Sequence, residues 1–190
     1  SEMCIRDRAN VGRSEQYGDL FPALITDWRR QWRSDFPFYF VQLANFMESK
    51  KIQPDSEWAA LREAQTKALK LDQVGMAVTI DIGLADDIHP KNKQEVGRRL
   101  ALVALAGSYG KNVSSSAPVF QNYIIKGNKM ELDFGQKQDG FQIKGTTLKG
   151  FTIAGPDRVF YPAEAMVHDG KIILSSTEAV SYTHLRAHET

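Results

Sequence analysis

Two short apolar runs, residues 36–43 and 76–82, each stand between segments with helix-forming character. Runs of this length, rich in aromatic or β-branched residues, are typical of strands that are buried on both faces of a parallel sheet. The flanking segments 13–33, 56–70 and 92–108 carry apolar residues at three- and four-residue steps or are rich in strong helix formers. The order helix, strand, helix, strand, helix predicts an α/β fold with a parallel sheet and covering helices.

From residue 111 onwards the pattern changes to short alternating runs that are separated by turn residues. The candidate strands are residues 120–125, 129–134, 141–143, 151–154, 158–161, 166–168 and 171–175. Two turns between them, 126–129 and 168–171, place Gly next to Asn or Asp, which tolerates the positive φ of tight hairpin turns. We therefore expect a first domain over residues 9–110 and a small antiparallel β module over residues 111–179.

Composition excludes several classes of partner. The 190 residues hold 24 Lys and Arg against 23 Asp and Glu, so the net charge of +1 gives no electrostatic footprint for nucleic acid. No apolar run approaches the roughly eighteen residues that a membrane-spanning helix needs. The single Cys4 cannot form an internal disulfide. We expect no nucleic-acid partner and no membrane insertion.

Both ends of the chain resemble translated library-adapter DNA. Residues 180–190 are what one strand of a transposase-type adapter encodes, and residues 1–8 are what part of the opposite strand encodes. We therefore expect residues 9–179 to be the natural part, and to be a fragment. The helical spacing of His184 and His188 falls in the adapter-like tail and has no third ligand nearby, so we predict no metal site there.

The best candidate for catalytic chemistry is His89, which follows the second apolar run. Ligands and catalytic groups of open parallel sheets gather beyond the carboxyl ends of the strands. Asp86 and Asp87 lie three and two residues upstream of this histidine. An imidazole that takes a proton from a nucleophile, oriented by a carboxylate, is the arrangement of a hydrolase base. The alternative is that these side chains only cap the following helix or face solvent.

Other polar residues are weaker candidates. Gln42 and Asn45 follow the first apolar run and would meet substrate in the same crevice, or else hydrogen-bond the loop backbone. His168 lies beside Asp169 and Gly170 in a turn, which favours an exposed turn histidine. No serine stands in a Gly-x-Ser-x-Gly elbow, so the chain by itself does not complete a catalytic triad.

Several segments together carry a family resemblance. They are Asn10-Val-Gly-Arg-Ser-Glu-Gln-Tyr17, Leu20-Phe-Pro-Ala-Leu-Ile25 with Asp27-Trp28-Arg29, Pro37-Phe-Tyr-Phe-Val-Gln-Leu-Ala-Asn-Phe46, Trp58-Ala-Ala-Leu-Arg-Glu-Ala-Gln65, Gly75-Met-Ala-Val-Thr-Ile-Asp-Ile-Gly83, and Asp87-Ile-His-Pro-Lys-Asn-Lys93 with Leu148-Lys-Gly-Phe151. In this order and spacing they closely resemble the sialate O-acetylesterase family, within the SGNH/GDSL-type hydrolases. The resemblance covers nearly the whole of residues 9–179.

This resemblance implies a partial flavodoxin-like sheet, a catalytic serine upstream in the full-length protein, and a catalytic histidine that matches His89. Asp86 has the Asp-x-x-His offset common in such hydrolases, whereas Asp87 belongs to the Asp-Ile-His-Pro string. Asn10 matches the asparagine that ends a family segment of the type Trp-Tyr-Gln-Gly-Glu-Ser-Asn. The earlier part of that segment helps to build the oxyanion region, and adapter-like sequence replaces it here.

The resulting hypothesis is the C-terminal fragment of an exported bacterial carbohydrate esterase. The intact enzyme would remove O-acetyl groups from sialic acid or a related glycan by a Ser/His mechanism, with no metal and no organic cofactor. The fragment alone would be inactive, because the serine is absent. The alternative hypothesis is a non-catalytic glycan-binding protein on the same sheet, with the β module as the sugar contact.

Overall fold

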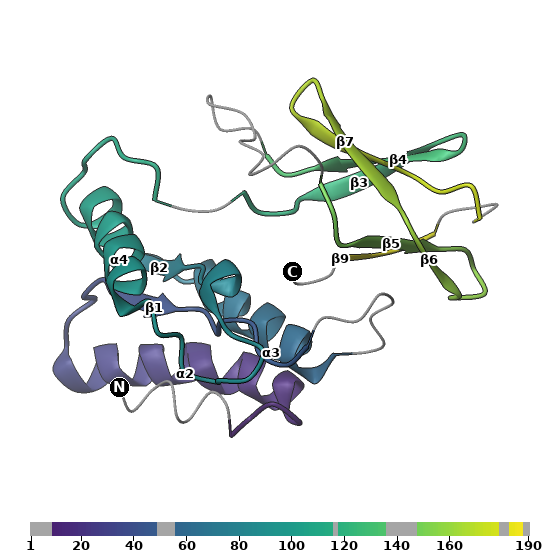
Figure 1. Cartoon of the computed structure of the whole chain (residues 1–190). Coiled ribbons are helices and arrows are strands. Elements are labelled where there is room, and N and C mark those ends of the chain that lie inside the picture. Colours follow the sequence, from purple (N-terminus) through teal and green to yellow (C-terminus); the bar gives the residue numbers. More distant parts are fainter. Residues whose placement is uncertain (1–8, 49–55, 116–117, 136–147, 179–182, 188–190) are drawn as a thin grey trace. The chain divides into compact units, whose positions relative to one another are not determined.

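The computed structural model describes residues 9–48, 56–115, 118–135, 148–178 and 183–187. The described residues fall into two compact units, one made of residues 9–48 and 56–115 and the other of the described residues from 118 onwards (Figure 1). The first unit contains three α-helices and a parallel pair of strands, and the second contains only strands.

The first unit is built on strands β1 (Phe38–Val41) and β2 (Val74–Ala77), which pair in parallel from Phe38 opposite Val74 to Val41 opposite Ala77. Its helices are α2 (Ser14–Trp32), α3 (Glu57–Thr66), which continues into the 3₁₀ turn η1 (Lys67–Lys70), and α4 (Lys93–Gly107). The α/β prediction with a parallel sheet is confirmed, and each predicted helix agrees with the structure to within a few residues.

The alternation of side chains along β1 sends neighbouring residues to opposite faces of the sheet. Phe38 and Phe40 face α2, where the ring of Phe21 packs edge-on against Phe40 with centroids 4.9 Å apart. Tyr39 faces α4, and its hydroxyl lies 2.7 Å from the hydroxyl of Ser108. The unit is therefore layered as helix, sheet, helix (Figure 1).

The main core of this unit lies between β1, α2 and α3. Its buried residues are Tyr17, Phe21, Ile25, Phe38, Phe40, Leu43, Trp58, Leu61, Ala64 and Ala68. The aromatic run that predicted a buried strand thus supplies two core rings. Helix α3 begins where its sequence predicts, because Ser56 caps it by accepting a hydrogen bond from the backbone N–H of Ala59 at 3.2 Å.

The predicted second strand, residues 76–82, is wrong at its carboxyl end. Strand β2 ends at Ala77, and residues Ile80–Ile82 form the 3₁₀ turn η2. Beyond Ala77 the chain bonds to groups outside the β1–β2 ladder: the hydroxyl of Thr79 donates to the carbonyl of Gln42 at 2.6 Å, and the guanidinium of Arg99 donates to the carbonyl of Val78 at 2.8 Å. Apolar content alone does not reveal such long-range partners.

The second unit consists of antiparallel strands in two sheets, which confirms the predicted antiparallel module. One sheet has the order β3-β4-β8-β7 and the other has the order β6-β5-β9. The strands are β3 (Asn122–Lys126), β4 (Lys129–Asp133), β5 (Phe151–Ala154), β6 (Phe160–Pro162), β7 (Glu164–His168), β8 (Lys171–Ser175) and β9 (His184–Ala187). The core contains Met130, Leu132, Ile153, Ile172 and Leu174.

Three details of this unit bear on the sequence predictions. Gly127 has positive φ in the β3–β4 turn, and both Asp169 and Gly170 have positive φ in the β7–β8 turn, as tight hairpins require. Strand β9 pairs with β5 although the sequence predicts no strand there, and His184 is extended rather than helical. The candidate strand at residues 141–143 lies outside the described residues.

Candidate functional site

The loops that follow β1 and β2 meet at the carboxyl edge of the sheet. The backbone N–H of Met47 donates to the carbonyl of Ala85 at 3.1 Å, which joins the two loops directly. Gly83 lies so close to Asn45 that a Cβ on the glycine would overlap the backbone and side-chain oxygens of Asn45. The structure therefore brings together the two loops that the sequence predicts to line one crevice.

His89 and Asp87 lie together within the second of these loops. The carboxylate Oδ1 of Asp87 accepts the backbone N–H of His89 at 2.8 Å and lies 3.4 Å from the imidazole Nδ1. The His89 side chain is 64% exposed. The hydrogen bond from the His89 backbone is the main cause that lowers the pKa of Asp87 below its ordinary value. Asp86 is exposed and forms no ion pair or side-chain hydrogen bond with the described residues.

The two candidates after β1 differ in their surroundings. The side chain of Gln42 is buried, and its Nε2 donates to the carbonyl of Arg62 on α3 at 3.3 Å, which favours a structural role over substrate contact. Asn45 is half-buried, and its Oδ1 is buried without a hydrogen-bond partner among the described residues. Of the two, Asn45 has the side-chain oxygen that still needs a donor.

Asn10 lies in the turn before α2, half-buried, with its carbonyl accepting the backbone N–H of Arg13 at 2.8 Å. Val11, which follows it, packs against the main core of the first unit. Ile88, which precedes His89, packs against the same core. The turn of Asn10 and the loop of His89 are thus anchored on one hydrophobic cluster.

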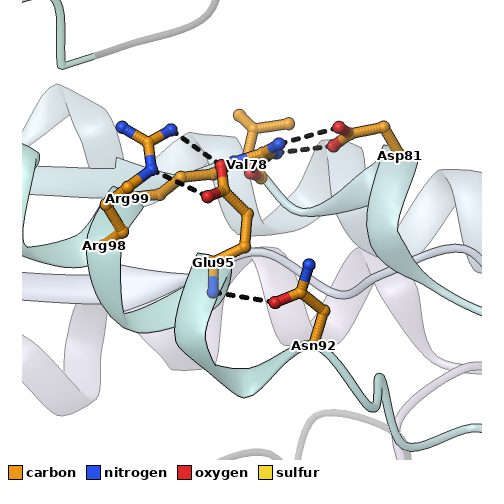
Figure 2. Close-up of polar contacts among 6 residues, drawn as sticks. All are labelled: Val78, Asp81, Asn92, Glu95, Arg98 and Arg99. Atoms are coloured by element: carbon orange, nitrogen blue, oxygen red, sulfur yellow. Dashed lines mark hydrogen bonds and ion pairs between the residues drawn. The ribbon is translucent and has the colours of Figure 1, made fainter.

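Sequence reasoning missed a polar cluster that joins η2 to α4 (Figure 2). Arg99 of α4 pairs with Asp81 of η2 through two bonds, Nη1 to Oδ1 at 2.5 Å and Nη2 to Oδ2 at 2.7 Å. Its Nε donates to Glu95 at 2.8 Å, and Arg98 donates to Glu95 through two bonds of 2.7 Å. The Glu95–Arg99 spacing of four residues on a helix is a sequence signal, but nothing in the pattern points to Asp81.

The hydrogen bonds within this cluster stabilise the ionised forms of Glu95 and Arg99. Hydrogen bonds from Arg98 and Arg99 lower the pKa of Glu95 from its ordinary 4.5 to about 2. The paired carboxylate of Asp81 is the leading cause that raises the pKa of Arg99 above its ordinary value. Both side chains therefore stay ionised across the physiological range of pH.

The described residues contain no group of three or more His, Cys, Asp or Glu side chains that could hold a metal ion. Among the same residues, no helix is both long enough and apolar enough to span a membrane. His168 is exposed at the end of β7, with its Nδ1 3.1 Å from Asp169. It lies in the hairpin turn that the sequence predicts.

The comparisons with known proteins identify first a class and then a family. The structure is similar to the crystal structure of a carbohydrate acetylesterase from Xanthomonas citri, with a TM-score of 0.79 and 39% identity, over 90% of this chain and 40% of that one. The fold is therefore shared with a carbohydrate acetylesterase.

In sequence, the chain is 33% identical to rat sialate O-acetylesterase over 165 residues, which are 78% of this chain and 30% of the rat protein. It is 34% identical to the human enzyme of that name over 160 residues, or 74% of this chain and 30% of the human protein. No protein-family model matches the chain. The matches confirm that the chain is related to the sialate O-acetylesterase family, and it spans less than a third of the length of these relatives.

Proposed function

We propose that this chain supplies the general base of a serine-type carbohydrate esterase that removes O-acetyl groups from sialic acid or a related glycan. The observation that carries the proposal is the position of His89, beside Asp87, in the loop that follows β2. The names of the relatives from rat, human and Xanthomonas citri support the substrate class. In this proposal, residues 9–110 belong to the esterase domain and residues 111–179 form a β-rich module.

The nucleophilic serine comes, in this proposal, from the part of the family's length that the chain does not span. The serine hydroxyl attacks the acetyl carbonyl while His89 takes its proton. The protonated His89 then gives this proton to the departing sugar oxygen, which leaves an acetyl-serine. His89 next deprotonates a water molecule, and the attack of this water releases acetate and regenerates the serine. None of these steps needs a metal or an organic cofactor.

The carboxylate in this mechanism orients the imidazole and stabilises its protonated form. The 3.4 Å separation between Oδ1 and Nδ1 supports Asp87 for this role, with Asp86 as the alternative. Asn45 is the better of the two candidates for substrate contact after β1, since Gln42 is turned towards α3. Asn10 remains a proposed contact at the oxyanion side. An acetylated glycan as substrate fits a bacterial protein that is exported from the cytoplasm.

The test is a histidine substitution in an enzyme that contains the rest of the fold. Such an enzyme is a chimera in which this segment replaces the matching part of the Xanthomonas citri relative. The unmodified chimera must first be shown to hydrolyse an aryl acetate. We expect His89→Ala to lower kcat by roughly 10³-fold or more. His168→Ala, which removes another exposed histidine, is the matched control and should leave kcat unchanged. Near-normal turnover in the His89→Ala chimera would overturn the proposal.

A second candidate function is glycan binding without catalysis. It is favoured by the exposed aromatic side chains of Phe120 and Tyr123 on the second unit, because sugars stack on such rings. The same chimera separates the two functions. Retained binding of an O-acetylated sialic acid by a chimera that has no hydrolytic activity, with the nucleophilic serine in place, would favour the binding protein.

A further inference from the structure

The position of His89 depends on how the ends of its loop are held. Residues 83–91 contain no helix or strand, and they connect η2, which ends at Ile82, to the cap of α4 at Asn92. A loop without regular hydrogen bonds takes its conformation from its attachment points and from the few side chains that it buries. Within this loop Ile88 packs against the core and Pro90 is buried.

Arg99 bonds to the chain before the loop. Its Nη1 donates to Asp81 Oδ1 at 2.5 Å and to the carbonyl of Val78 at 2.8 Å, and its Nη2 donates to Asp81 Oδ2 at 2.7 Å. Two parallel bonds between a guanidinium and a carboxylate fix direction as well as distance. The turn η2 is therefore attached to the second turn of α4 (Figure 2).

Arg99 also bonds to the chain after the loop. Its Nε donates to Glu95 Oε1 at 2.8 Å. Glu95 stands in the first turn of α4, and its backbone N–H donates to Oδ1 of the capping residue Asn92 at 3.0 Å. One guanidinium thus connects the turn η2 just before the His89 loop to the helix start just after it.

The chemistry of this connection requires arginine. Four of its five N–H donors are used, in directions that a planar guanidinium supplies and an ammonium does not. The side chain is only 24% exposed, so solvent screens these bonds less than it screens a surface ion pair. Helix α4 has a separate attachment to the sheet, because the buried Val103 lies against Gly75 of β2. The loss of Arg99 should therefore loosen the loop before it detaches the helix.

We propose that Arg99 is a positioning residue for His89: by bonding Asp81 and Glu95 at once, it fixes the span of the loop that carries the catalytic histidine. This inference rests on the proposed function, in which His89 is the base. A reacting group displaced by about 1 Å loses on the order of 10²-fold in rate, so the span of the loop is a direct determinant of kcat.

The first test measures the loop itself, by hydrogen–deuterium exchange in the full chain. Arg99→Ala should speed exchange of the hydrogen-bonded amides within and beside the loop, those of Ile82, His89 and Glu95, by about tenfold or more and leave α2 and β1 unchanged. Arg98→Ala is the matched control, because Arg98 bonds the same Glu95 without reaching η2, and it should change exchange by less than about twofold. Asp81→Asn removes the bidentate pair from the other side and should act as Arg99→Ala does.

Three exchange results would overturn the inference. One is equal exchange in the Arg99→Ala and Arg98→Ala chains, since the bonds from Arg99 to η2 would then not stabilise the loop. Another is rapid exchange of the same three amides in the unsubstituted chain, since no ordered loop would exist to be positioned. Acceleration across the whole first unit would also contradict it, because Arg99 would then support the fold in general.

The second test measures catalysis in the chimera. Arg99→Ala should lower kcat about ten- to a hundredfold with KM changed less than about threefold, and Arg99→Lys should restore part of kcat. A raised KM at normal kcat would contradict positioning. The two proposals fail separately: if His89→Ala leaves turnover intact, the function fails, whereas if His89→Ala abolishes turnover and Arg99→Ala changes neither kcat nor exchange, only the positioning role fails.

Discussion

One carboxylate oxygen of Asp87 contacts His89 twice, at the backbone N–H (2.8 Å) and near the imidazole Nδ1 (3.4 Å). The first contact is an Asx-turn, a local motif in which a side chain bonds the backbone two residues on. The second is longer than an ordinary hydrogen bond, but catalytic contacts of this kind often tighten only when substrate is bound. The same carboxylate can therefore form the turn and orient the ring.

The first prediction separates these two roles of Asp87. Asp87→Asn keeps an oxygen that can accept the backbone N–H and removes the negative charge, so the turn should persist while stabilisation of the imidazolium is lost. We expect kcat of the chimera to fall by on the order of 10²-fold or more, and Asp86→Asn to change it less than about threefold. Initial rates on an aryl acetate measure both. Small and equal losses would mean that neither carboxylate orients His89.

The second prediction concerns pH and Glu95. The two arginines depress the pKa of Glu95 from 4.5 to about 2 in the folded chain. A depressed pKa stabilises the fold fully above pH 4.5, the ordinary value, and this contribution is lost as the pH falls towards 2. Glu95→Gln should therefore lower Tm at pH 7 and reduce the drop in Tm between pH 5 and pH 3, as thermal unfolding monitored by circular dichroism would show.

Glu15 provides the control for this experiment, because it is an exposed glutamate in the first turn of another helix, α2. Glu15→Gln should leave the pH profile of Tm close to that of the unsubstituted chain. If Glu95→Gln and Glu15→Gln give the same profile, the arginine pairing of Glu95 contributes nothing to acid stability.

The third prediction compares two leucines on helices. Leu61 on α3 is fully buried in the main core, whereas Leu20 on α2 is 61% exposed. Leu61→Ala should lower the free energy of unfolding by about 2–5 kcal/mol, from lost burial and the cavity left behind, while Leu20→Ala should change it by less than about 0.5 kcal/mol. Urea unfolding followed by fluorescence measures both. Similar values for the two variants would contradict the assigned core.

The sequence predicts those parts of the fold that depend on local pattern. The short apolar run at residues 36–43 predicts a buried strand from its own composition, and the structure places Phe38 and Phe40 of this strand in the core. The end of β2 is not predictable in this way, because the residues that follow it bond to Arg99, which lies 18 residues along the chain from its partner Asp81. The apolar run at residues 76–82 resembles a strand throughout, although the carbonyl of Val78 within it accepts a hydrogen bond from the distant guanidinium of Arg99.

The candidate site shows the same difference between local features, which the sequence predicts, and long-range contacts, which it does not. The pairing of His89 with an acidic neighbour is visible because the two are adjacent in sequence. The burial of Gln42 is not visible, since it depends on a carbonyl of α3 that lies 20 residues further along the chain. The sequence does not predict strand β9, because this strand falls in the tail that resembles adapter sequence.

The last prediction uses two uncrowded glycines that differ in backbone conformation. At both Gly97 and Gly110 an added Cβ would meet no atom within 4 Å, so neither site is crowded. Gly97 lies within α4, where alanine is the better helix former, and Gly97→Ala should raise the free energy of unfolding by about 0.4–1 kcal/mol. Gly110 has φ of +60°, so Gly110→Ala should lower it by roughly 1–2 kcal/mol through backbone strain. Opposite signs in urea unfolding are the expected result. A stabilised Gly110→Ala chain would show that the residues after α4 can adopt another backbone conformation without cost.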